Sequence, residues 1–269
     1  KLSEAASHFL RVGKIAPQSP VRANAEYDAA AAYIAMKDWP SASRVLENFR
    51  RTYPGHSLQA DVSNKLAVAY LEQGKWSHAA LEFEVLASDK NKDPQVRREA
   101  LWQAAELQEK AGDHQRALTA YERYVTQFPN PFEPAMEARH RLAGISQKRG
   151  QTASRDRWLH ELVKAEQDGG SSRTDRTRFL AATAAMTLAE PHYEAFRAAR
   201  LKEPLKKSLK IKKEKMQQAL KAYGRAADYG VAEVATAATY HIAEIYRDFG
   251  RDLLTSQRPK GLSAEELEQ

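Results

Sequence analysis

Residues 29–54 read AAAAYIAMKDWPSASRVLENFRRTYP, and two later stretches repeat their pattern: residues 66–87 read LAVAYLEQGKWSHAALEFEVLA, and residues 104–129 read AAELQEKAGDHQRALTAYERYVTQFP. Each stretch begins with an Ala-rich segment, passes through a short turn and continues into a second segment with helical spacing. The small residue of the second segment falls at Ala42, Ala79 and Ala117, which are 37 and 38 residues apart. A fixed period of this length indicates stacked supersecondary units.

The pattern extends on both sides of these stretches. The opening segment matches at Ala5, Phe9, Val12 and Pro17, and a degenerate further copy matches at Ala143, Gly150, Leu159 and Leu162. A generic Ala-rich helical bundle is the alternative interpretation, because Ala is the strongest helix former in any context. A bundle, however, has no reason to place Gly and Pro at a fixed period, so the sequence favours repeats.

The repeat resembles the tetratricopeptide repeat (TPR), a helix–turn–helix unit of about 34 residues. The matching positions are the small residues Ala30, Ala67, Ala105 and Ala143, the aromatics Tyr33 and Tyr70 with Gln108 and Ser146 in the later copies, the turn residues Lys37, Gly74, Gly112 and Gly150, and the closing Pro17, Pro54 and Pro129. The resemblance implies an all-α fold, a right-handed superhelix of stacked antiparallel helix pairs (an α-solenoid). Residues 1–167 would hold a partial first repeat, three clear copies and one degenerate copy.

The second half departs from this pattern. A Gly/Ser-containing run predicts a linker over residues 168–175, and residues 176–269 predict divergent TPR-like helices. We expect one helix from Arg176 that stops near Pro191, a long Lys-rich helix from Pro204 that ends at Gly230, and a last helix over residues 231–254. These helices fit TPR units spread apart by an insertion of about one helical pair.

The two ends of the sequence suggest a longer protein. The chain opens with KLSEAASHFL, which has neither a Met nor a signal-peptide pattern, and it opens inside a predicted helix. Near the other end, Ser263 and Glu266 have the spacing of a capping box that starts a helix. We therefore expect the sequence to be an excerpt that is truncated at the C-terminus.

Composition and motifs argue against an enzyme. The 269 residues include no Cys, which excludes disulfides, zinc-thiolate sites and cysteine nucleophiles, and no window has the roughly 18 apolar residues of a membrane span. The sequence also lacks HExxH, GxGxxG, GxxxxGK, GxSxG and SxxK. We therefore predict no catalytic residues, no metal site and no cofactor.

The resemblance places partner binding on a concave groove lined by the first helix of each pair. The expected groove residues are Tyr27, Asn64, Leu71, Glu99, Trp102, Glu106, Glu109 and His140. An acidic ridge runs from Asp61 to Glu137, and Tyr27 and Trp102 have the side chains that dominate interface energetics. Trp102 has a second interpretation, as packing between repeats. The Lys/Asn/Arg clamp of the family's chaperone-binding members is missing, so we expect no chaperone-tail binding.

A basic run covers Lys202–Lys215, where seven Lys and two Glu give +5 of the formal net charge of +7. Three interpretations remain open: a solvated helix face, contact with an acidic protein or anionic lipid, and contact with nucleic acid. Nucleic acid is the weakest of these, because the run has no interleaved aromatics or Arg. The predicted basic patch on this helix is Lys206, Lys207, Lys210 and Lys213.

The expected function is a non-catalytic scaffold for protein–protein interaction whose partner offers a basic or extended segment. The turns PQSPVRA, PGHSLQA and PNPFEPA are longer than those of a 34-residue repeat and are similar to turns in TPR proteins of the Gram-negative cell envelope. This similarity implies a bacterial envelope assembly and a periplasmic location, with the cytoplasm as the alternative. The alternative function is binding of nucleic acid or an anionic surface through the Lys202–Lys215 helix.

Overall fold

The computed structural model describes residues 1–256 and residue 265, and over these residues it contains helices and no strand. The helices are α1 (Leu2–Ile15), α2 (Arg22–Ala35), α3 (Trp39–Thr52), α4 (Gln59–Glu72), α5 (Trp76–Ser88), α6 (Pro94–Lys110), α7 (His114–Gln127), α8 (Phe132–Lys148), α9 (Thr152–Asp168), the short 3₁₀ helix η1 (Gly170–Ser172), α10 (Asp175–Ala198), α11 (Leu205–Ala227) and α12 (Ala232–Leu254). The expected capping box of Ser263 and Glu266 lies outside the described residues.

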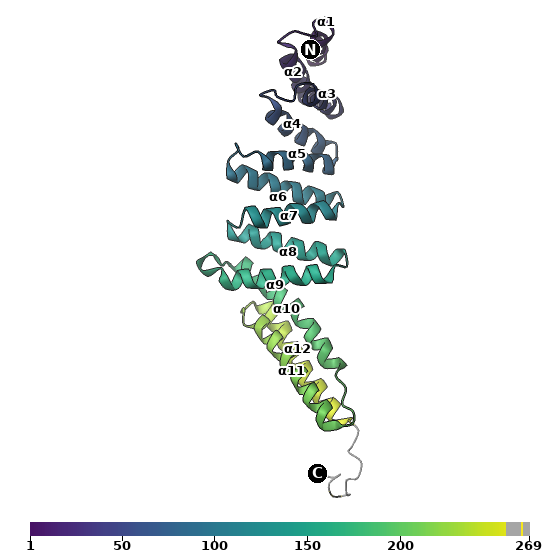
Figure 1. Cartoon of the computed structure of the whole chain (residues 1–269), viewed down its shortest axis with the longest axis vertical. Helices are drawn as coiled ribbons and strands as arrows, with labels where there is room; N and C mark the ends of the chain where they lie inside the picture. The colour runs from purple at the N-terminus through teal and green to yellow at the C-terminus, as the bar shows by residue number, and fades with distance from the viewer. Residues whose placement is uncertain (257–264, 266–269) are drawn as a thin grey trace. The chain divides into compact units, whose positions relative to one another are not determined.

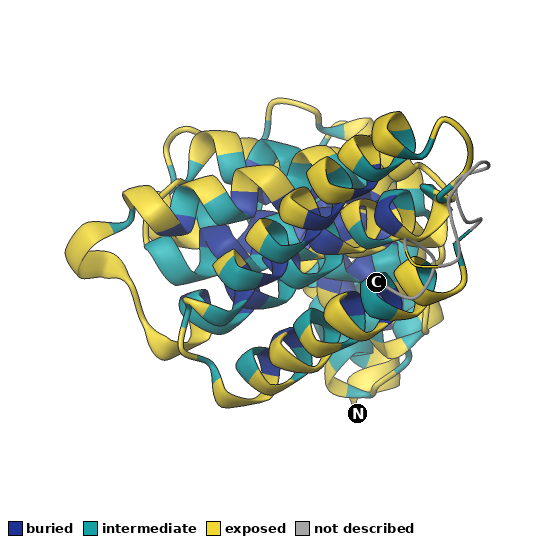
Figure 2. Cartoon of the chain, turned by 90° about the horizontal axis from the view of Figure 1, so that it is seen from below, coloured by how far each residue is buried: buried dark blue, intermediate teal, exposed yellow. Residues whose placement is uncertain are grey.

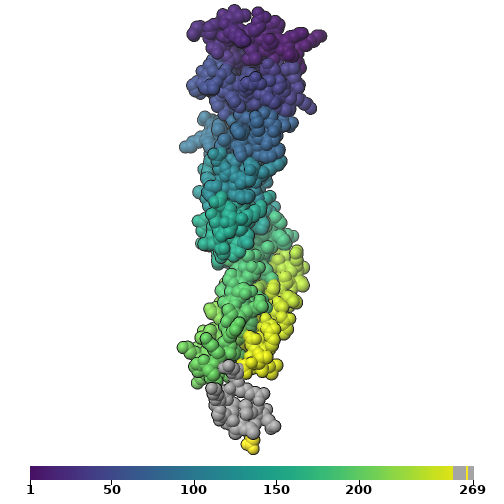
Figure 3. Space-filling model, turned by 90° about the vertical axis from the view of Figure 1, so that its right-hand side faces the viewer, coloured from purple at the N-terminus to yellow at the C-terminus, as the bar shows by residue number. Residues whose placement is uncertain are grey.

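Helices that are neighbours in the sequence are also neighbours in space. The chain divides into two compact units, unit 1 over residues 1–128 and unit 2 over residues 129–269. Within unit 1, each helix from α1 to α7 packs on the next, and in Figure 3 the surface colours of this unit follow one another in chain order. Within unit 2, α8 to α12 also pack in chain order, and α10 in addition contacts α8 and α12 (Figure 1). The predicted all-α solenoid of sequential helix pairs is therefore confirmed, while the right-handed superhelix stays a prediction.

The turns within the helix pairs share one geometry, which explains why Gly recurs at the repeat period. Gly74, Gly112 and Gly150 have φ of 68°, 78° and 69°, and Lys37 takes the same left-handed conformation with φ 58°. In every case the next backbone N–H donates to the carbonyl five residues earlier, for example Asp38 N to Tyr33 O at 2.9 Å. This bond is the signature of a Schellman motif, in which the left-handed residue favours Gly.

Small side chains form the contact between paired helices. Ala30, Ala42, Ala79, Ala105 and Ala117 are all fully buried. Figure 2 shows such buried positions on the inner sides of the helices and exposed positions on the outer sides. Because a methyl side chain lets two backbones approach closely, the Ala period of the sequence becomes the line along which each helix pair packs.

Buried polar groups connect successive helices of unit 1. The Glu26 carboxylate is 5% exposed and accepts hydrogen bonds from Tyr53 Oη at 3.1 Å and Asn48 Nδ2 at 3.3 Å. The Arg50 guanidinium binds both carboxylate oxygens of Glu82, with Nη1 to Oε1 at 2.7 Å, and this hydrogen bonding raises the pKa of Arg50. A buried charge is tolerated when it is paired in this way. The Glu26 contacts join the two helices of one repeat, and the Arg50–Glu82 contact joins one repeat to the next.

The predicted helix stop at Pro191 is wrong, because α10 continues through this residue to Ala198. Proline lacks an N–H and removes one backbone hydrogen bond, which costs stability. Beyond the proline, however, Tyr193 and Phe196 keep the helical spacing and pack into the buried cluster shared with α11 and α12. Burial of these aromatic rings outweighs the lost hydrogen bond, so tertiary packing overrides the local signal.

The run predicted as a linker has a defined local structure inside unit 2. Residues 170–172 form η1, and a Cβ added at Gly169 would lie 2.8 Å from the Phe132 ring of α8. The Thr174 and Thr177 side chains then form a capping box that begins α10. The Phe132 ring explains the Gly at position 169 and the left-handed backbone explains the Gly at position 170, while a division of the chain at 168–175 stays a prediction.

Candidate functional site

The first-helix face of unit 1 consists of side chains from α2, α4 and α6 at equivalent positions of successive repeats. Its members are Tyr27, Asn64, Val68, Leu71, Glu99, Trp102, Glu106 and Glu109. Asn64, Val68 and Glu99 are exposed, and the others are half-buried. Val68 keeps 46% of its surface exposed, which makes it the apolar residue most available to a partner on this face.

Tyr27 and Asp61 link two first helices. The Tyr27 hydroxyl donates to the Asp61 carboxylate, and Lys65 Nζ lies 3.7 Å from the same carboxylate and 5.4 Å from the Tyr27 ring centroid. The Tyr27 ring also meets Phe49 edge-on. Asp61 is thus partly neutralised within the chain, and Tyr27 contributes to the packing of α2 on α4 as well as to the surface.

Trp102 packs between the helices of its own pair. Its ring meets Tyr121 edge-on with centroids 5.5 Å apart and Tyr124 with centroids 5.2 Å apart, so it joins α6 to α7. The side chain remains half-buried rather than buried. Trp102 therefore packs within one repeat and not between repeats, and its role as a groove anchor stays a prediction.

The carboxylates of α6 differ in what they contact. Glu99 accepts a hydrogen bond from Gln95 Nε2 at 2.9 Å. Glu106 makes no hydrogen bond or ion pair with any residue that the structure describes. Among the expected groove residues of this helix, Glu106 thus has the carboxylate most ready to accept a cation from outside the chain.

The predicted groove residue His140 and Glu137, the end of the predicted acidic ridge, both lie on α8 in unit 2. Glu137 binds Arg176 of α10 in an ion pair that raises the pKa of the guanidinium. His140 is half-buried, and this burial lowers its pKa, which favours the neutral imidazole. In unit 2, therefore, the predicted ridge carries a paired carboxylate and a neutral ring instead of free negative charge.

The predicted basic patch is exposed on α11. Lys206, Lys207, Lys210 and Lys213 are all exposed, and none pairs with a carboxylate of the described residues. Ile211, on the same turn of helix, keeps 44% of its surface exposed. The patch therefore has four unneutralised ammonium groups beside one apolar side chain.

Lys212 is not part of the exposed basic patch, although it lies in the same run of the sequence. Its side chain is fully buried, and Nζ lies 2.5 Å from an Asp252 carboxylate oxygen of α12. The same ammonium donates to the backbone carbonyls of Phe196 at 3.3 Å and Ala199 at 2.8 Å. It therefore neutralises the negative end of the α10 dipole and holds three helices together.

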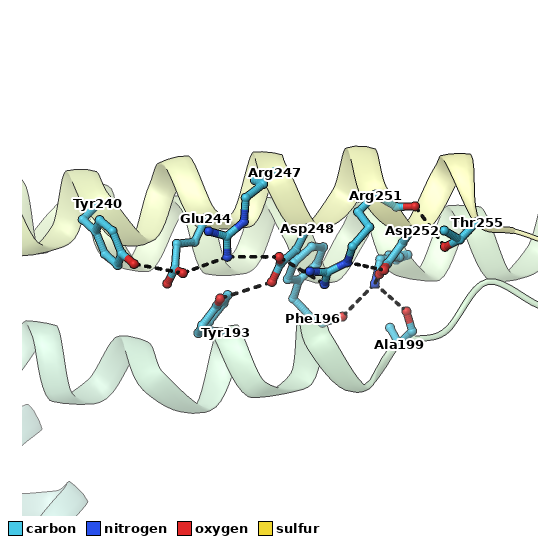
Figure 4. A network of polar contacts seen from close by, with 11 residues as sticks. Tyr193, Phe196, Ala199, Tyr240, Glu244, Arg247, Asp248, Arg251, Asp252 and Thr255 are labelled. Carbon is cyan, nitrogen blue, oxygen red and sulfur yellow. Dashed lines mark hydrogen bonds and ion pairs between the residues drawn. The ribbon is translucent and has the colours of Figure 1, made fainter.

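A polar network continues from this lysine along α12. Figure 4 shows Asp248 pointing toward Tyr193 of α10, whose hydroxyl donates to it at 3.3 Å, while Arg251 reaches it from the other side at 3.1 Å. Asp248 is 5% exposed, so its carboxylate is cut off from water and needs these donors to be stable in the folded protein. The network explains why acidic residues stand at these positions of α12. In the sequence they show only helical spacing, which does not predict a buried polar contact.

Unit 1 has two hollows on its second-helix side that were not predicted from the sequence. One, of about 810 Å³, is lined by Ser63 of α4 and by Leu81 and Val85 of α5. The other, of about 500 Å³, is lined by Glu26 of α2 and by Arg44 and Asn48 of α3, which precede those three by 37 residues each. The two hollows are thus copies of one groove between repeats. The 37-residue spacing relates Leu81 and Val85 of one hollow to Arg44 and Asn48 of the other.

The residues that the structure describes include neither a metal-binding cluster nor a membrane-spanning helix. No group of three or more His, Asp or Glu side chains there is arranged to hold a metal ion. No helix there is both long enough and apolar enough to cross a membrane.

Comparison with protein families supports the repeat assignment. The family model of the tetratricopeptide repeat matches residues 24–56, which span α2 and α3, and residues 99–131, which span most of α6 and all of α7. These two segments are therefore assigned to that repeat. Repeats of this kind generally bind protein partners and are usually non-catalytic.

Comparisons with whole proteins add little. No curated protein matches the chain. Among solved structures, the chain is similar to the crystal structure of BtubC (BKLC) from P. vanneervenii, at 12% sequence identity and a TM-score of 0.35, over 98% of this chain and 93% of that one.

Proposed function

We propose that the protein is a non-catalytic scaffold that binds a partner segment on the first-helix face of unit 1. The observation that carries the proposal is the pair of equivalent positions Val68 and Glu106. Val68 is an exposed apolar side chain, and Glu106 is a carboxylate with no partner among the described residues. Apolar contact and an available charge on one face are what a protein-binding surface offers, and both lie on first helices of TPR-like pairs.

The chemistry of this face favours a basic, extended partner segment. Glu99 and Glu106 lie seven residues apart on α6, which places them on one side of the helix about 10 Å apart. Carboxylates at this spacing complement Lys or Arg side chains of an extended strand, whose residues rise about 3.3 Å each. Charge complementarity of this kind speeds encounter and selects among partners.

A charge-swap experiment tests this proposal. Glu99→Lys with Glu106→Lys should weaken partner binding by about tenfold or more while circular dichroism stays unchanged, because opposite charges become like charges. The matched control makes the same change of charge on second helices, with Glu84→Lys on α5 and Glu122→Lys on α7, and should bind as the parent does. Equal affinity of the parent and the charge-swapped variant, measured by titration calorimetry, would place the binding site elsewhere.

The compartment is a separate proposal. The long Pro-bearing turns support a place in a bacterial envelope assembly, on the periplasmic side. Fractionation of cells that express the gene tests it: the protein should be found in the periplasmic fraction, and its presence in the cytoplasmic fraction alone would contradict the proposal.

The exposed patch on α11 supports a second candidate function, contact with an anionic surface. Its four ammonium groups have no carboxylate partner among the described residues, and like charges at i, i+4 repel by a few tenths of a kcal/mol. The triple variant Lys206→Glu, Lys210→Glu and Lys213→Glu should abolish salt-sensitive retention on vesicles of anionic lipid and leave the helix content unchanged. Retention equal to the parent, on both vesicles and nucleic acid, would make the patch a solubilising face.

A further inference from the structure

Unit 2 contains a cleft that the sequence did not suggest. Its volume is about 570 Å³, and it lies where α9, α10 and α11 meet. Its apolar wall includes Val163 of α9, Leu188 of α10 and Ala222 of α11. The volume is within the range of known ligand sites, and a wall of this kind can hold an apolar side chain.

Three arginines converge on this cleft. Arg173, which lies between η1 and α10, donates from Nε to the buried Glu166 carboxylate at 2.8 Å, so its Nη groups stay available. Arg178 of α10 has only a loose contact of 3.5 Å with Asp175, whose side chain is 99% exposed. Arg225 of α11 contacts no carboxylate that the structure describes. Guanidinium groups with free donors are suited to bind carboxylates in a bidentate geometry.

The negative charge within the cleft does not balance these groups. Asp228, which directly follows α11, is the one carboxylate among the residues that line it. His160 and His192 also line the cleft and are exposed, so they add hydrogen-bonding capacity to the same surface. The residues that line the cleft therefore carry a net positive charge.

A buried hydroxyl beside the cleft lacks a partner. Tyr229 lines the cleft, and its Oη is inaccessible to solvent and makes no hydrogen bond within the described part of the chain. Most buried hydroxyls are paired, because an unpaired one loses its bonds to water without compensation. Because this oxygen is inaccessible from the cleft, Tyr229 contributes its ring to the cleft wall and its hydroxyl is not a ligand contact.

The cleft is elongated along α10. Arg178 and His192, near its two ends on that helix, are 14 residues apart, which corresponds to about 21 Å at 1.5 Å per residue. An extended peptide covers this distance with about six residues. The length thus favours a peptide over a compact small molecule.

From this arrangement we propose that the cleft binds an acidic peptide segment of a partner protein. Carboxylates of the segment pair with Arg173, Arg178 and Arg225, and an apolar side chain of the segment packs against Leu188 and its neighbours. This site is distinct in residues and in charge from the first-helix face of unit 1, so the two proposals can fail independently.

Fluorescence anisotropy with a fluorescein-labelled peptide, Glu-Leu-Glu-Glu-Leu-Glu, tests the proposal on the whole chain at one fixed salt concentration. The parent should bind this peptide at least about tenfold more tightly than the same peptide with Gln in place of Glu. The variant Arg178→Gln with Arg225→Gln should lose about tenfold in affinity. Tyr229→Phe should bind the peptide as the parent does, because the Tyr229 hydroxyl is inaccessible from the cleft.

A matched control separates a site from general attraction. Arg197→Gln with Lys221→Gln removes two positive charges from the same two helices, and Arg197 has an i, i+3 ion pair as Arg178 does. This control should bind the peptide as the parent does. The proposal is overturned if the control weakens binding as much as Arg178→Gln with Arg225→Gln, if the Glu and Gln peptides bind alike, or if a single-stranded oligonucleotide of equal charge displaces the Glu peptide at equal concentration.

Discussion

Unit 1 and unit 2 hold their helices together in different ways. The helices α1 to α7 have 13 to 17 residues, and a turn with a left-handed residue joins α2 to α3, α4 to α5 and α6 to α7, whereas α10, α11 and α12 have 23 or 24 residues. In unit 1 the close helix contacts are made by Ala at a fixed period. In unit 2 a fully buried lysine and a nearly buried aspartate, Lys212 and Asp248, join the long helices.

Contacts that recur in every repeat and a contact that occurs once stabilise the packed helices in different ways. Repeated turns and small residues give each pair the same packing, so unit 1 spreads its stability over many similar contacts. Lys212 instead serves α10, α11 and α12 at once, and no other residue repeats its role among the described ones. A single substitution should therefore cost more at the buried charge of unit 2 than at a turn of unit 1.

The largest effect is expected from Asp252→Ala in unit 2. The substitution leaves the buried Lys212 ammonium without its counterion, which should lower the free energy of unfolding by about 3 kcal/mol. Adding Lys212→Met should recover most of the loss, because the unpaired charge is then gone. Urea unfolding followed by circular dichroism measures both, and a double variant as unstable as the single one would show that the charge is not the cause.

A smaller loss, about 2 kcal/mol, is expected from Ala79→Trp in unit 1. Ala79 is fully buried between paired helices, so a large ring must push them apart. Val85→Trp on the same helix is the control, because Val85 is 52% exposed and can take the ring at the surface. If the two variants melt at the same temperature, the repeat register is wrong.

The smallest effect is expected at the turns. Lys37→Gly should raise the free energy of unfolding by about 1 kcal/mol, because Gly has no Cβ to strain the left-handed backbone. Gly112→Ala should lower it by a similar amount, since no atom lies within 4 Å of the added Cβ and only the backbone conformation resists it. Opposite signs for the two variants in thermal unfolding confirm that the four turns share one geometry, and equal signs contradict it.

Local signals that recur at the repeat period predicted the fold of unit 1 well. Gly74 and Gly112 lie at turns, and Ala79 and Ala117 lie at helix contacts, because those positions need a left-handed residue and a small side chain in every copy. Pro191 was misleading for the opposite reason. Its local effect on the backbone is outweighed by ring burial at Phe196, which depends on helices that follow later in the chain.

The candidate site was predicted only in part, because charge in a sequence does not show where its partner lies. The positions of Val68 and Glu106 follow from the repeat register, Val68 is exposed and Glu106 half-buried, and their part in binding stays a prediction. By contrast, Lys212 looks like its solvated neighbours, although a carboxylate 40 residues later binds it. The cleft of unit 2 needs three helices to come together, so no single segment contains a pattern for it.

Site-specific photo-crosslinking tests most directly which face of unit 1 meets the partner. A photoreactive amino acid replaces either Val68 on the first-helix face or Val85 on the second-helix side, two valines with exposures of 46% and 52%. With the natural partner present, the probe at position 68 should give a covalent adduct and the probe at position 85 should not. Adducts from position 85 alone would contradict the proposal and move the partner to the second-helix groove.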